Sequence, residues 1–504
     1  MKEHRHAPSP LMRIRRSRFF QPLLIAIGLT TFLLFIYRST SSSSSSSSSS
    51  GTTSASEGGS KLTDYSHGGD VAYPPKWDKM AQWQKDLPQH DLNLPYPEGR
   101  TGRYLKFSSQ IRYLGWNNCL NEMLMNNALA YDVGRAYVFN DYWWKHDYYP
   151  WPSATANQHD VRTPLNAIIS GPTSGMPYDA GDPAPRSVHE DYWELACPPS
   201  ERVIINTREV KKKAGPGEEV IIEGEGSAIW DAWKRKLKSV DGARCVEIVP
   251  APREEDTVPQ VFDLWFFGSV HSLSVWDRFR KSPVSRLLKT AGPVNSGIER
   301  NAHLFLPVGA ASKIGPRDPF ERMMAMHVRR GDYKQACDSL AAWNSTYYNW
   351  NLLPELPDHF PPPPGGGYGW NTPENIEKYM EHCLPEIPAI VKKARDSRDD
   401  YIRTMRAKRG GEGAMVDVMY LLTNDKSEWM MGLIEALRKD GWKNIKTSND
   451  LELDQLQKDV NMAIDMDIAR RAAVFIGNGW SSMSSNIVHR RVLDEHDPMG
   501  TRFW

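Results

Sequence analysis

The sequence predicts an α/β protein built around parallel β-sheet. Short apolar strands alternate with amphipathic helices after residue 104 and, most clearly, along the last third of the 504-residue chain. This alternation is typical of a parallel sheet that helices cover on both faces. Polar turns follow several of the strands, and ligands of such sheets lie beyond the carboxyl ends of the strands. The pattern therefore predicts the fold class and also the edge at which a ligand would bind.

The most informative turn follows the apolar strand 323–328. His327 lies near the end of the strand, and Arg329 and Asp332 follow it around a glycine. An arginine can hold phosphate oxygens with two parallel charge-assisted hydrogen bonds, which a lysine cannot do. For this turn alone, a solvated loop with a surface ion pair is the alternative. A second, Gly/Ser-rich turn at 477–486 follows another apolar strand, and two such turns indicate a single nucleotide cleft.

The remaining elements follow from periodicity and from turn residues. A capping threonine followed by proline, Thr372 and Pro373, opens a helix, and the proline and glycine run 361–367 marks an exposed loop. Strands are expected over 104–107, 110–114, 136–139, 202–206, 219–223, 246–249, 323–328, 416–423, 442–447 and 473–476. Helices are expected over 118–132, 228–238, 275–289, 427–439, 454–470 and 482–492.

Composition narrows the class of protein. A chain of 504 residues exceeds what one hydrophobic core usually supports, so two or three domains are expected. The 62 Lys and Arg against 61 Asp and Glu give no global field, which argues against a nucleic-acid-binding protein. Eighteen tryptophans permit a sugar site but do not require one, because most will be core.

The N-terminal segments predict a membrane anchor. A basic tail, 1–18, precedes an uncharged stretch, 19–37, that is just long enough to span a bilayer, and a Ser-rich stem or linker is expected over 38–95. The excess of positive charge before the stretch puts the tail in the cytosol and the body in the lumen, as a single-pass type II protein. A cleaved signal peptide is the alternative. This layout is typical of Golgi glycosyltransferases.

Three stretches resemble the GDP-fucose protein O-fucosyltransferase family. HVRRGDYKQAC (327–337) resembles the family's H-x-R-x-G-x-D-W-x-x-A-C segment, and FIGNGWSSMSSNIVHRR (475–491) resembles F-I-G-N-x-x-S-S-x-[ST]-x-x-V-x-R. YLGWNNCLNEM (113–123) is similar to the glycine–asparagine loop near the start of the family's catalytic domain. The three occur in the family's order and span roughly residue 104 to the C-terminus.

The resemblance implies a GT-B-like architecture, with two Rossmann-like domains facing a cleft. We expect an acceptor-side domain over 96–300 and a nucleotide-sugar-binding domain over 301–504. It also implies inverting transfer of fucose from GDP-fucose, with Arg329 stabilising the departing phosphate and Asn117 beside the transfer site. The nucleotide-sugar-binding residues that it implies are His327, Arg329, Asp332, Asp425, Ser481, Ser482 and Ser484.

Several of these residues have a plain structural alternative. Arg330 could be a surface residue or pair with Asp332, and His327 could orient the turn instead of contacting the nucleotide. Ser482 could simply cap the helix that follows it, and a strand-end aspartate such as Asp425 is common for structural reasons. The binding interpretation is favoured for the serines because they follow the Ile-Gly-Asn-Gly turn.

The general base is not assigned. Asn117 is no strong base, and Leu114 stands where some relatives carry a glutamate. Glu122, on the following helix, is expected to be a solvated acid. The D-x-D triplet at Asp465 and Asp467 is expected on a helix face rather than in a strand-end loop, so we expect no metal to be required.

Cysteines and one sequon fit a lumenal body. The pair expected from the resemblance is Cys337 with Cys383, which flank the insertion 338–372; pairing of Cys197 with Cys245 is a guess. No C-x-x-C spacing indicates zinc. Asn344 begins an N-glycosylation sequon.

The sequence as a whole predicts a Golgi or ER lumenal glycosyltransferase that acts on a protein or glycan hydroxyl. Two alternatives stay open. One is a catalytically silent, membrane-tethered protein that binds glycan or nucleotide on the same fold. The other is a glycosyltransferase that uses a different nucleotide sugar.

Overall fold

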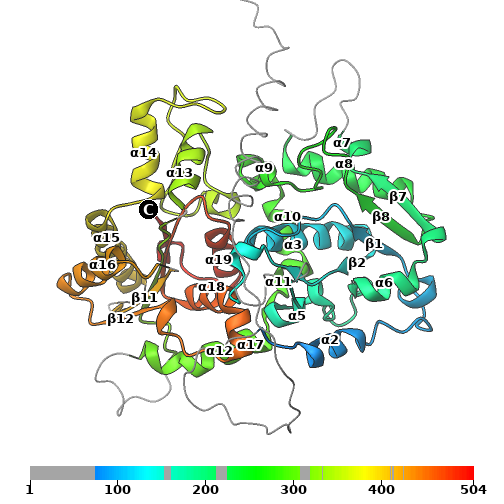
Figure 1. Ribbon diagram of the computed structural model, residues 1–504, viewed down its shortest axis with the longest axis horizontal. Coiled ribbons are helices and arrows are strands. Elements are labelled where there is room, and N and C mark those ends of the chain that lie inside the picture. The colour runs from blue at the N-terminus through cyan, green and yellow to red at the C-terminus, as the bar shows by residue number, and fades with distance from the viewer. Residues whose placement is uncertain are drawn as a thin grey trace, which may run out of the picture.

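Two parallel β-sheets of five strands each form the framework of the protein (Figure 1). A computed structural model describes residues 74–151, 161–211, 224–306, 318–331, 333–408, 410, 414–423 and 425–504. The first sheet has the order β6 (Val188–His189), β2 (Ala136–Phe139), β1 (Tyr104–Phe107), β8 (Cys245–Val249) and β7 (Arg202–Asn206). The second has the order β12 (Asn444–Thr447), β11 (Val418–Leu422), β10 (Met323–His327), β13 (Val474–Gly477) and β14 (Thr501–Phe503).

Every neighbouring pair within these two sheets is parallel. The α/β class and the two Rossmann-like sheets expected from the sequence are therefore confirmed. Two small antiparallel pairs accompany them: β3 (Tyr142–Trp143) with β4 (Arg162–Thr163), and β5 (Ile169–Ser170) with β9 (Lys289–Thr290).

Helices cover both sheets. In the first half these are α2 (Asp78–Lys85), α3 (Trp116–Asp132), α5 (Leu165–Ile168), α6 (Glu190–Ala196), α7 (Arg208–Lys211), α8 (Gly226–Ser239), α9 (Leu264–Phe267), α10 (Trp276–Lys281), α11 (Pro283–Arg286) and α12 (Gly292–Asn301). In the second half they are α13 (Tyr333–Ala342), α14 (Pro373–Cys383), α15 (Ile387–Lys408), α16 (Glu428–Lys439), α17 (Gln455–Asp459), α18 (Asn461–Arg471) and α19 (Ser482–Leu493).

Strand β10 shows why the second sheet needs helices on both faces. All five of its residues are buried. Successive side chains of a strand point to opposite faces, and here Met323 and Ala325 join one core cluster while Met324 and Met326 join another. The first cluster includes residues of α18 and α19, and the second includes residues of α15 and α16. The continuous apolar run in the sequence therefore reflects a strand covered on both sides.

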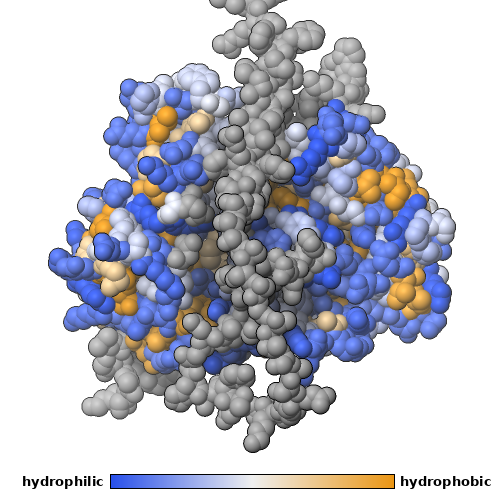
Figure 2. Space-filling model, viewed as in Figure 1, coloured by the Kyte–Doolittle hydropathy of each residue, from blue (hydrophilic) through white to orange (hydrophobic). Residues whose placement is uncertain are grey.

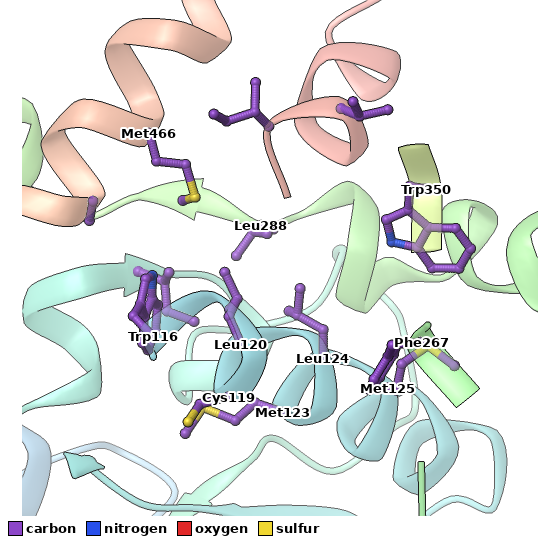
Figure 3. Packing of buried hydrophobic residues seen from close by; sticks show 14 of the residues in the cluster. Trp116, Cys119, Leu120, Met123, Leu124, Met125, Phe267, Leu288, Trp350 and Met466 are labelled. Carbon is purple, nitrogen blue, oxygen red and sulfur yellow. The ribbon is translucent and has the colours of Figure 1, made fainter. Parts of the chain in front are cut away.

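The two halves share one hydrophobic core. Figure 3 shows Leu120 and Leu124 of α3 pointing towards Leu288, with Met466 of α18 on the far side of Leu288. All four belong to the same buried cluster, although together they span more than 300 positions of the chain. The halves are consequently packed against each other and not merely tethered.

A buried carboxylate adds a polar link between the halves. Asp459, at the end of α17, is 1% exposed. It accepts hydrogen bonds from Trp77 Nε1 at 2.9 Å, Trp151 Nε1 at 2.9 Å and Thr163 Oγ1 at 2.7 Å. Burial raises the pKa of Asp459. Its three donors all come from the first half of the chain, so one residue of the second half gathers three separate segments of the first.

Two disulfides lie within the halves. Cys197 pairs with Cys245 in the first, and Cys337 pairs with Cys383 in the second. Both pairings named from the sequence are therefore present. Cys119 has a free thiol and is buried, and burial raises its pKa to about 12.

Some boundaries expected from the sequence are wrong. Residues 110–114 are not a strand, because the chain turns there and Tyr113 has a positive φ of 56°. The helix expected over 275–289 is broken at Pro283, which begins α11 and lacks the N–H that a continuing helix requires. The helix expected over 454–470 is interrupted at Val460, between α17 and α18. The strand expected over 219–223 lies outside the described residues.

The structure describes only a part of the N-terminal region for which a tail, an anchor and a stem are expected. The tail 1–18, the anchor 19–37 and most of the stem 38–95 lie outside the described residues. From 74 to 95 the chain belongs to the folded body, since it includes α2 and the contact of Trp77 with Asp459. Within the described part, no helix is both long and apolar enough to cross a membrane. On the face in Figure 2 hydrophilic residues predominate and hydrophobic ones form separate patches.

Candidate active site

Three turns meet at one edge of the second sheet. Strand β10 pairs in parallel with β11 on one side and with β13 on the other, with Met326 opposite Leu421 and Ile476. The carboxyl ends of these strands therefore lie side by side. The turns after them are the basic turn at 327–331, the turn before Asp425 and the Gly/Ser-rich turn at 477–484. The structure thus brings together the turns in which the sequence placed a nucleotide cleft.

A buried hydrogen-bond network joins β10 to the Gly/Ser-rich turn. His327 is 5% exposed, and its Nδ1 lies 3.3 Å from Oγ of Ser484, which is fully buried. The same Oγ accepts a hydrogen bond from the backbone N–H of Asn478 at 3.1 Å. Burial, and after it the charge of Arg329, lowers the pKa of His327 to about 3. His327 is therefore neutral near pH 7 and contacts the Gly/Ser-rich turn, while its contact with nucleotide stays a prediction.

Arg329 lies partly exposed just beyond this network. Its guanidinium is 4.8 Å from the ring centroid of Tyr333, a cation–π distance. The hydroxyl of Tyr333 in turn donates to Oδ1 of Asn478 at 3.3 Å. Gly331, between the two, has a φ of +65°, and a side chain added there would meet no atom within 4 Å. The basic turn can therefore place a cation next to the Gly/Ser-rich turn, with open space beside the backbone.

Arg330 has a structural role instead. It donates hydrogen bonds to the carbonyls of Leu384 and Pro385, and its guanidinium lies 3.6 Å from the ring centroid of Trp429. These contacts tie the basic turn to the connection between α14 and α15 and to α16. Asp332, its alternative partner, lies outside the described residues, as does the predicted nucleotide contact of Asp332.

The three serines of the Gly/Ser-rich turn differ in what their side chains do. Ser481, not Ser482, is the N-cap of α19, because its Oγ accepts from the backbone N–H groups of Met483 and Ser484. Ser484 is occupied by His327 and Asn478. Ser482 is partly exposed at the first position of the helix. The hydroxyl of Ser482 can face a ligand, together with the positive end of the helix dipole, and the nucleotide contacts of all three serines stay predictions.

Asp425 is partly exposed and begins the connection to α16. Its carboxylate accepts from the backbone N–H of Ser427 at 2.8 Å and from the Ser427 hydroxyl at 2.9 Å. This is the structural alternative named for a strand-end aspartate. The predicted contact of Asp425 with guanine stays a prediction, since each carboxylate oxygen can accept a further hydrogen bond.

Asn117 lies across from this edge, on the other half of the molecule. It is the second residue of α3 and is 9% exposed. Nδ2 of Asn486, on α19, lies 2.9 Å from the carbonyl oxygen of Asn117 and 3.0 Å from its Oδ1. The helix that begins at the Gly/Ser-rich turn therefore contacts the loop expected on the acceptor side.

Sequence reasoning missed the segment 345–351, which supports the Gly/Ser-rich turn. Asn351 Nδ2 donates to the carbonyls of Gly479 and Ser481, and Trp480 Nε1 donates to the carbonyl of Ser345. A Cβ on Gly479 would lie 2.2 Å from the ring of Tyr347, so only glycine fits there. The segment is polar and aromatic without periodicity, and no motif within it marked this role.

Glu122 is not the solvated acid that was expected. It is 2% exposed, and its Oε2 accepts from the backbone N–H of Ile111 at 2.8 Å. Burial raises the pKa of Glu122 to about 8. At neutral pH this carboxyl is mostly protonated, and it braces the loop before α3. Because it is 2% exposed, Glu122 has little access to an acceptor hydroxyl, and the general base stays unassigned.

The two carboxylates of the D-x-D triplet point to different partners. Both lie in α18, as the helical pattern predicted. Asp465 accepts from the hydroxyls of Tyr420 and Ser448, while Asp467 pairs with Arg470 and Arg471. Among the described residues no group of three His, Cys, Asp or Glu side chains could hold a metal ion.

Asn344 follows α13 and has a positive φ of 50°. Its Oδ1 is 3.3 Å from Nδ2 of Asn371 and 3.3 Å from the hydroxyl of Tyr379. The side chain is partly buried, and its glycosylation stays a prediction.

Comparisons with known proteins give structural likeness only. No family model matches the chain, and no curated protein matches it. The crystal structure of POFUT1 in complex with GDP-fucose covers 80% of this chain and 98% of its own, at 13% identity and a TM-score of 0.44. The structure of POFUT1 in complex with GDP has the same coverage and identity, with a TM-score of 0.45. NodZ alpha-1,6-fucosyltransferase soaked with GDP-fucose covers 78% of this chain and 92% of its own, at 11% identity and a TM-score of 0.32.

The chain is structurally similar to the POFUT1 and NodZ fucosyltransferases over about four fifths of its length.

Proposed function

We propose that this protein is an inverting glycosyltransferase that moves fucose from GDP-fucose to a hydroxyl of a protein or glycan. One observation carries the proposal: Arg329 stands at the carboxyl end of the central strand β10, next to the turn that begins α19. The sequence motifs for a nucleotide diphosphate sugar fall in these two turns. The donor, the inversion and the acceptor class come from the family resemblance.

Breaking the anomeric C–O bond leaves negative charge on the departing diphosphate. Arg329 would offset that charge, with the Ser482 hydroxyl and the positive end of the α19 dipole at the neighbouring strand end. Such donors act through positions fixed before the reaction. Asn117 would lie on the acceptor side, and the general base remains unassigned.

A metal-independent reaction fits the partners of the acidic residues. The carboxylates of Asp465 and Asp467 are engaged by hydroxyls and by guanidiniums. The positive charge that a metal would bring to the diphosphate is available from Arg329. The proposed reaction therefore uses GDP-fucose as donor substrate without a divalent cation.

We also propose that the body faces the lumen of the Golgi or the ER, held by the N-terminal anchor. The disulfides Cys197–Cys245 and Cys337–Cys383 suit an oxidising compartment. In intact microsomes a C-terminal tag should be protected from protease, while a tag before Met12 should be cleaved. A secreted product that begins after Arg38 would show a cleaved signal instead.

The decisive experiment is a panel of nucleotide sugars given to the full-length protein in detergent, with and without EDTA. We expect hydrolysis or transfer with GDP-fucose that EDTA leaves unchanged. Activity with only UDP-sugars or other GDP-sugars would refute the donor. Activity abolished by EDTA would refute the metal-free mechanism.

A silent binding protein on the same fold is the second candidate. The burial of Glu122 favours it, because this acid beside the acceptor loop is then not accessible to an acceptor hydroxyl and no other general base is assigned. GDP binding in a calorimeter, without turnover of any donor across a broad acceptor set, would support this candidate over the first.

A further inference from the structure

Two helices begin at the two sides of the proposed reaction. Helix α19 begins at Ser482, in the turn proposed to take the diphosphate, and α3 begins at Trp116, one residue before Asn117. Asn486 lies one turn into α19. It is 1% exposed, so its side chain lies within the contact between the two halves.

The contact of Asn486 with Asn117 has a definite direction. A single amide nitrogen of Asn486 donates to both oxygens of Asn117, at 2.9 and 3.0 Å. Both oxygens of Asn117 are thereby turned towards α19. Among the described residues, Nδ2 of Asn117 has no hydrogen-bond partner. The two acceptors of Asn117 are therefore engaged by α19, while its donor is left for another group.

A second link joins the same two elements. The backbone N–H of Tyr348 donates to the carbonyl of Gly479 at 2.9 Å. The hydroxyl of Tyr348 donates to Oδ1 of Asn118 at 3.2 Å and lies 3.5 Å from Nδ2 of Asn121. The diphosphate turn and the first turn of α3 are thus connected twice, through different residues.

We propose that Asn486 is a positioning residue for sugar transfer. By holding both oxygens of Asn117, it fixes the distance between the acceptor loop and the diphosphate turn and fixes which atoms of Asn117 face the reacting groups. Asn486 itself touches no substrate. It occupies a position that the family motif leaves open, so the resemblance does not assign it a role. This inference rests on the proposed function.

The physical expectation follows from how transfer depends on geometry. A displacement of about 1 Å of a group near the reacting atoms can cost on the order of a hundredfold in rate. Loss of the Asn486 contacts should therefore lower transfer to the acceptor, while binding of GDP at the turn before α19 is preserved.

The variants are Asn486→Leu and Asn486→Asp in the full-length protein. Both are close to asparagine in size and neither has an amide nitrogen, and the aspartate also places a carboxylate against two carbonyl oxygens. Ser485→Ala is the matched control, because Ser485 is buried on the same helix but accepts from the backbone N–H of Trp350 and does not touch Asn117. The readouts are turnover with acceptor, turnover with water, GDP affinity and hydrogen exchange of the segment 113–121.

We expect both Asn486 variants to lose on the order of a hundredfold in transfer to acceptor, with GDP affinity within about twofold of wild type. Exchange over 113–121 should be faster than in wild type and in Ser485→Ala. Combining Asn486→Leu with Asn117→Ala should cost less than the sum of the two single losses, since both remove the contact with Oδ1 of Asn117, while the backbone carbonyl of residue 117 keeps its hydrogen bond in Asn117→Ala.

Wild-type exchange over 113–121 in both Asn486 variants would overturn the inference, whatever the activity. So would equal losses in Asn486→Leu and Ser485→Ala. If the wild-type protein turns over no nucleotide sugar, the proposed function fails and the catalytic part of this inference falls with it. Faster exchange in the variants would then show Asn486 to be a structural link only.

Discussion

Nδ1 of His327 lies 3.3 Å from Oγ of Ser484, although 157 positions separate the two residues in the chain. The contact closes the gap between the ends of β10 and β13, and the backbone N–H of Asn478 completes it. Because burial lowers the pKa of His327 to about 3, the contact does not change with protonation in the neutral range. The hydrogen bond that holds the turn beside Arg329 is therefore independent of pH under ordinary assay conditions.

Arg329→Ala should remove a contact that strengthens as the diphosphate departs. We expect turnover to fall by about a hundred- to a thousandfold, or roughly 3–4 kcal/mol of barrier. Arg329→Lys should restore little, because the ammonium keeps the charge and loses the planar fork. Steady-state kinetics on protein with an unchanged melting curve measures this. A folded Arg329→Ala variant with wild-type turnover would refute the assignment.

Arg330→Ala tests the neighbouring arginine for comparison with Arg329→Ala. It removes the hydrogen bonds to the carbonyls of Leu384 and Pro385 and the packing on Trp429. We expect a lower melting temperature, with a loss of about 1–3 kcal/mol in stability, and turnover per folded molecule close to wild type. A fall in turnover as large as that of Arg329→Ala, without loss of stability, would mean that Arg330 also contacts the donor.

Glu122 should make the protein less stable as the pH rises. Its pKa is raised from 4.5 to about 8 in the folded state, so the folded chain holds the proton more tightly than the unfolded chain. This contribution is complete below about pH 4.5 and is lost as the pH rises towards 8, by up to about 1.4 kcal/mol per pH unit. Glu122→Gln keeps an acceptor for Ile111 and should remove that slope. Chemical denaturation at pH 5, 6.5 and 8 measures it; parallel curves for the two proteins would contradict the prediction.

Asp465→Ala should destabilise the protein without affecting metal dependence. The substitution leaves the hydroxyls of Tyr420 and Ser448 without their acceptor, at a cost of about 1–3 kcal/mol. The substitution would leave stability nearly unchanged only if the triplet lay on a solvated helix face. Thermal melts measure the loss, and Asp465→Asn, which retains an acceptor oxygen, should be milder. If added manganese raised the activity of the wild type but not that of folded Asp465→Ala, Asp465 would belong to a metal site.

Thiol counting tests the disulfides. Of the five cysteines, Cys119 is the one with a free thiol. Because it is buried and its pKa is raised to about 12, native protein should resist alkylation, and protein unfolded without reductant should take up one label. Changing both Cys337 and Cys383 to serine should cost about 2–4 kcal/mol. Three or more labels on unfolded, unreduced protein would contradict the pairing.

Much of the fold could be predicted because strands buried on both faces read as continuous apolar runs. The strands at 104–107, 136–139 and 202–206 occur at the expected residues, and β10 begins where expected and ends one residue earlier. The helix α15, Ile387–Lys408, could not be recognised, because only four of its residues are buried and its mean hydropathy is low. The interruption at Val460 could not be recognised either, because it follows Asp459, whose bonding partners lie about 300 to 380 positions away in the chain.

The candidate site was predictable as a set of turns but not as a set of side-chain roles. Arg329 and the serines were marked by residue type and by position after strands. The capping role of Ser481, the burial of Ser484 and the link from Asn486 to Asn117 depend on how the two halves meet. In the sequence Glu122 is an ordinary polar helix residue, because no local pattern predicts its hydrogen bond with the backbone N–H of Ile111.

Three donors of the first half bond to Asp459 of the second, so neither half is easily replaced by the corresponding half of another protein. A chimera that joins the second half to the first half of another protein would bury this carboxylate against whatever side chains happen to face it. A buried carboxylate without its donors is strongly destabilising. Joining the second half to the first half of another protein would therefore also require Trp77, Trp151 and Thr163. A division at the domain boundary leaves out all three.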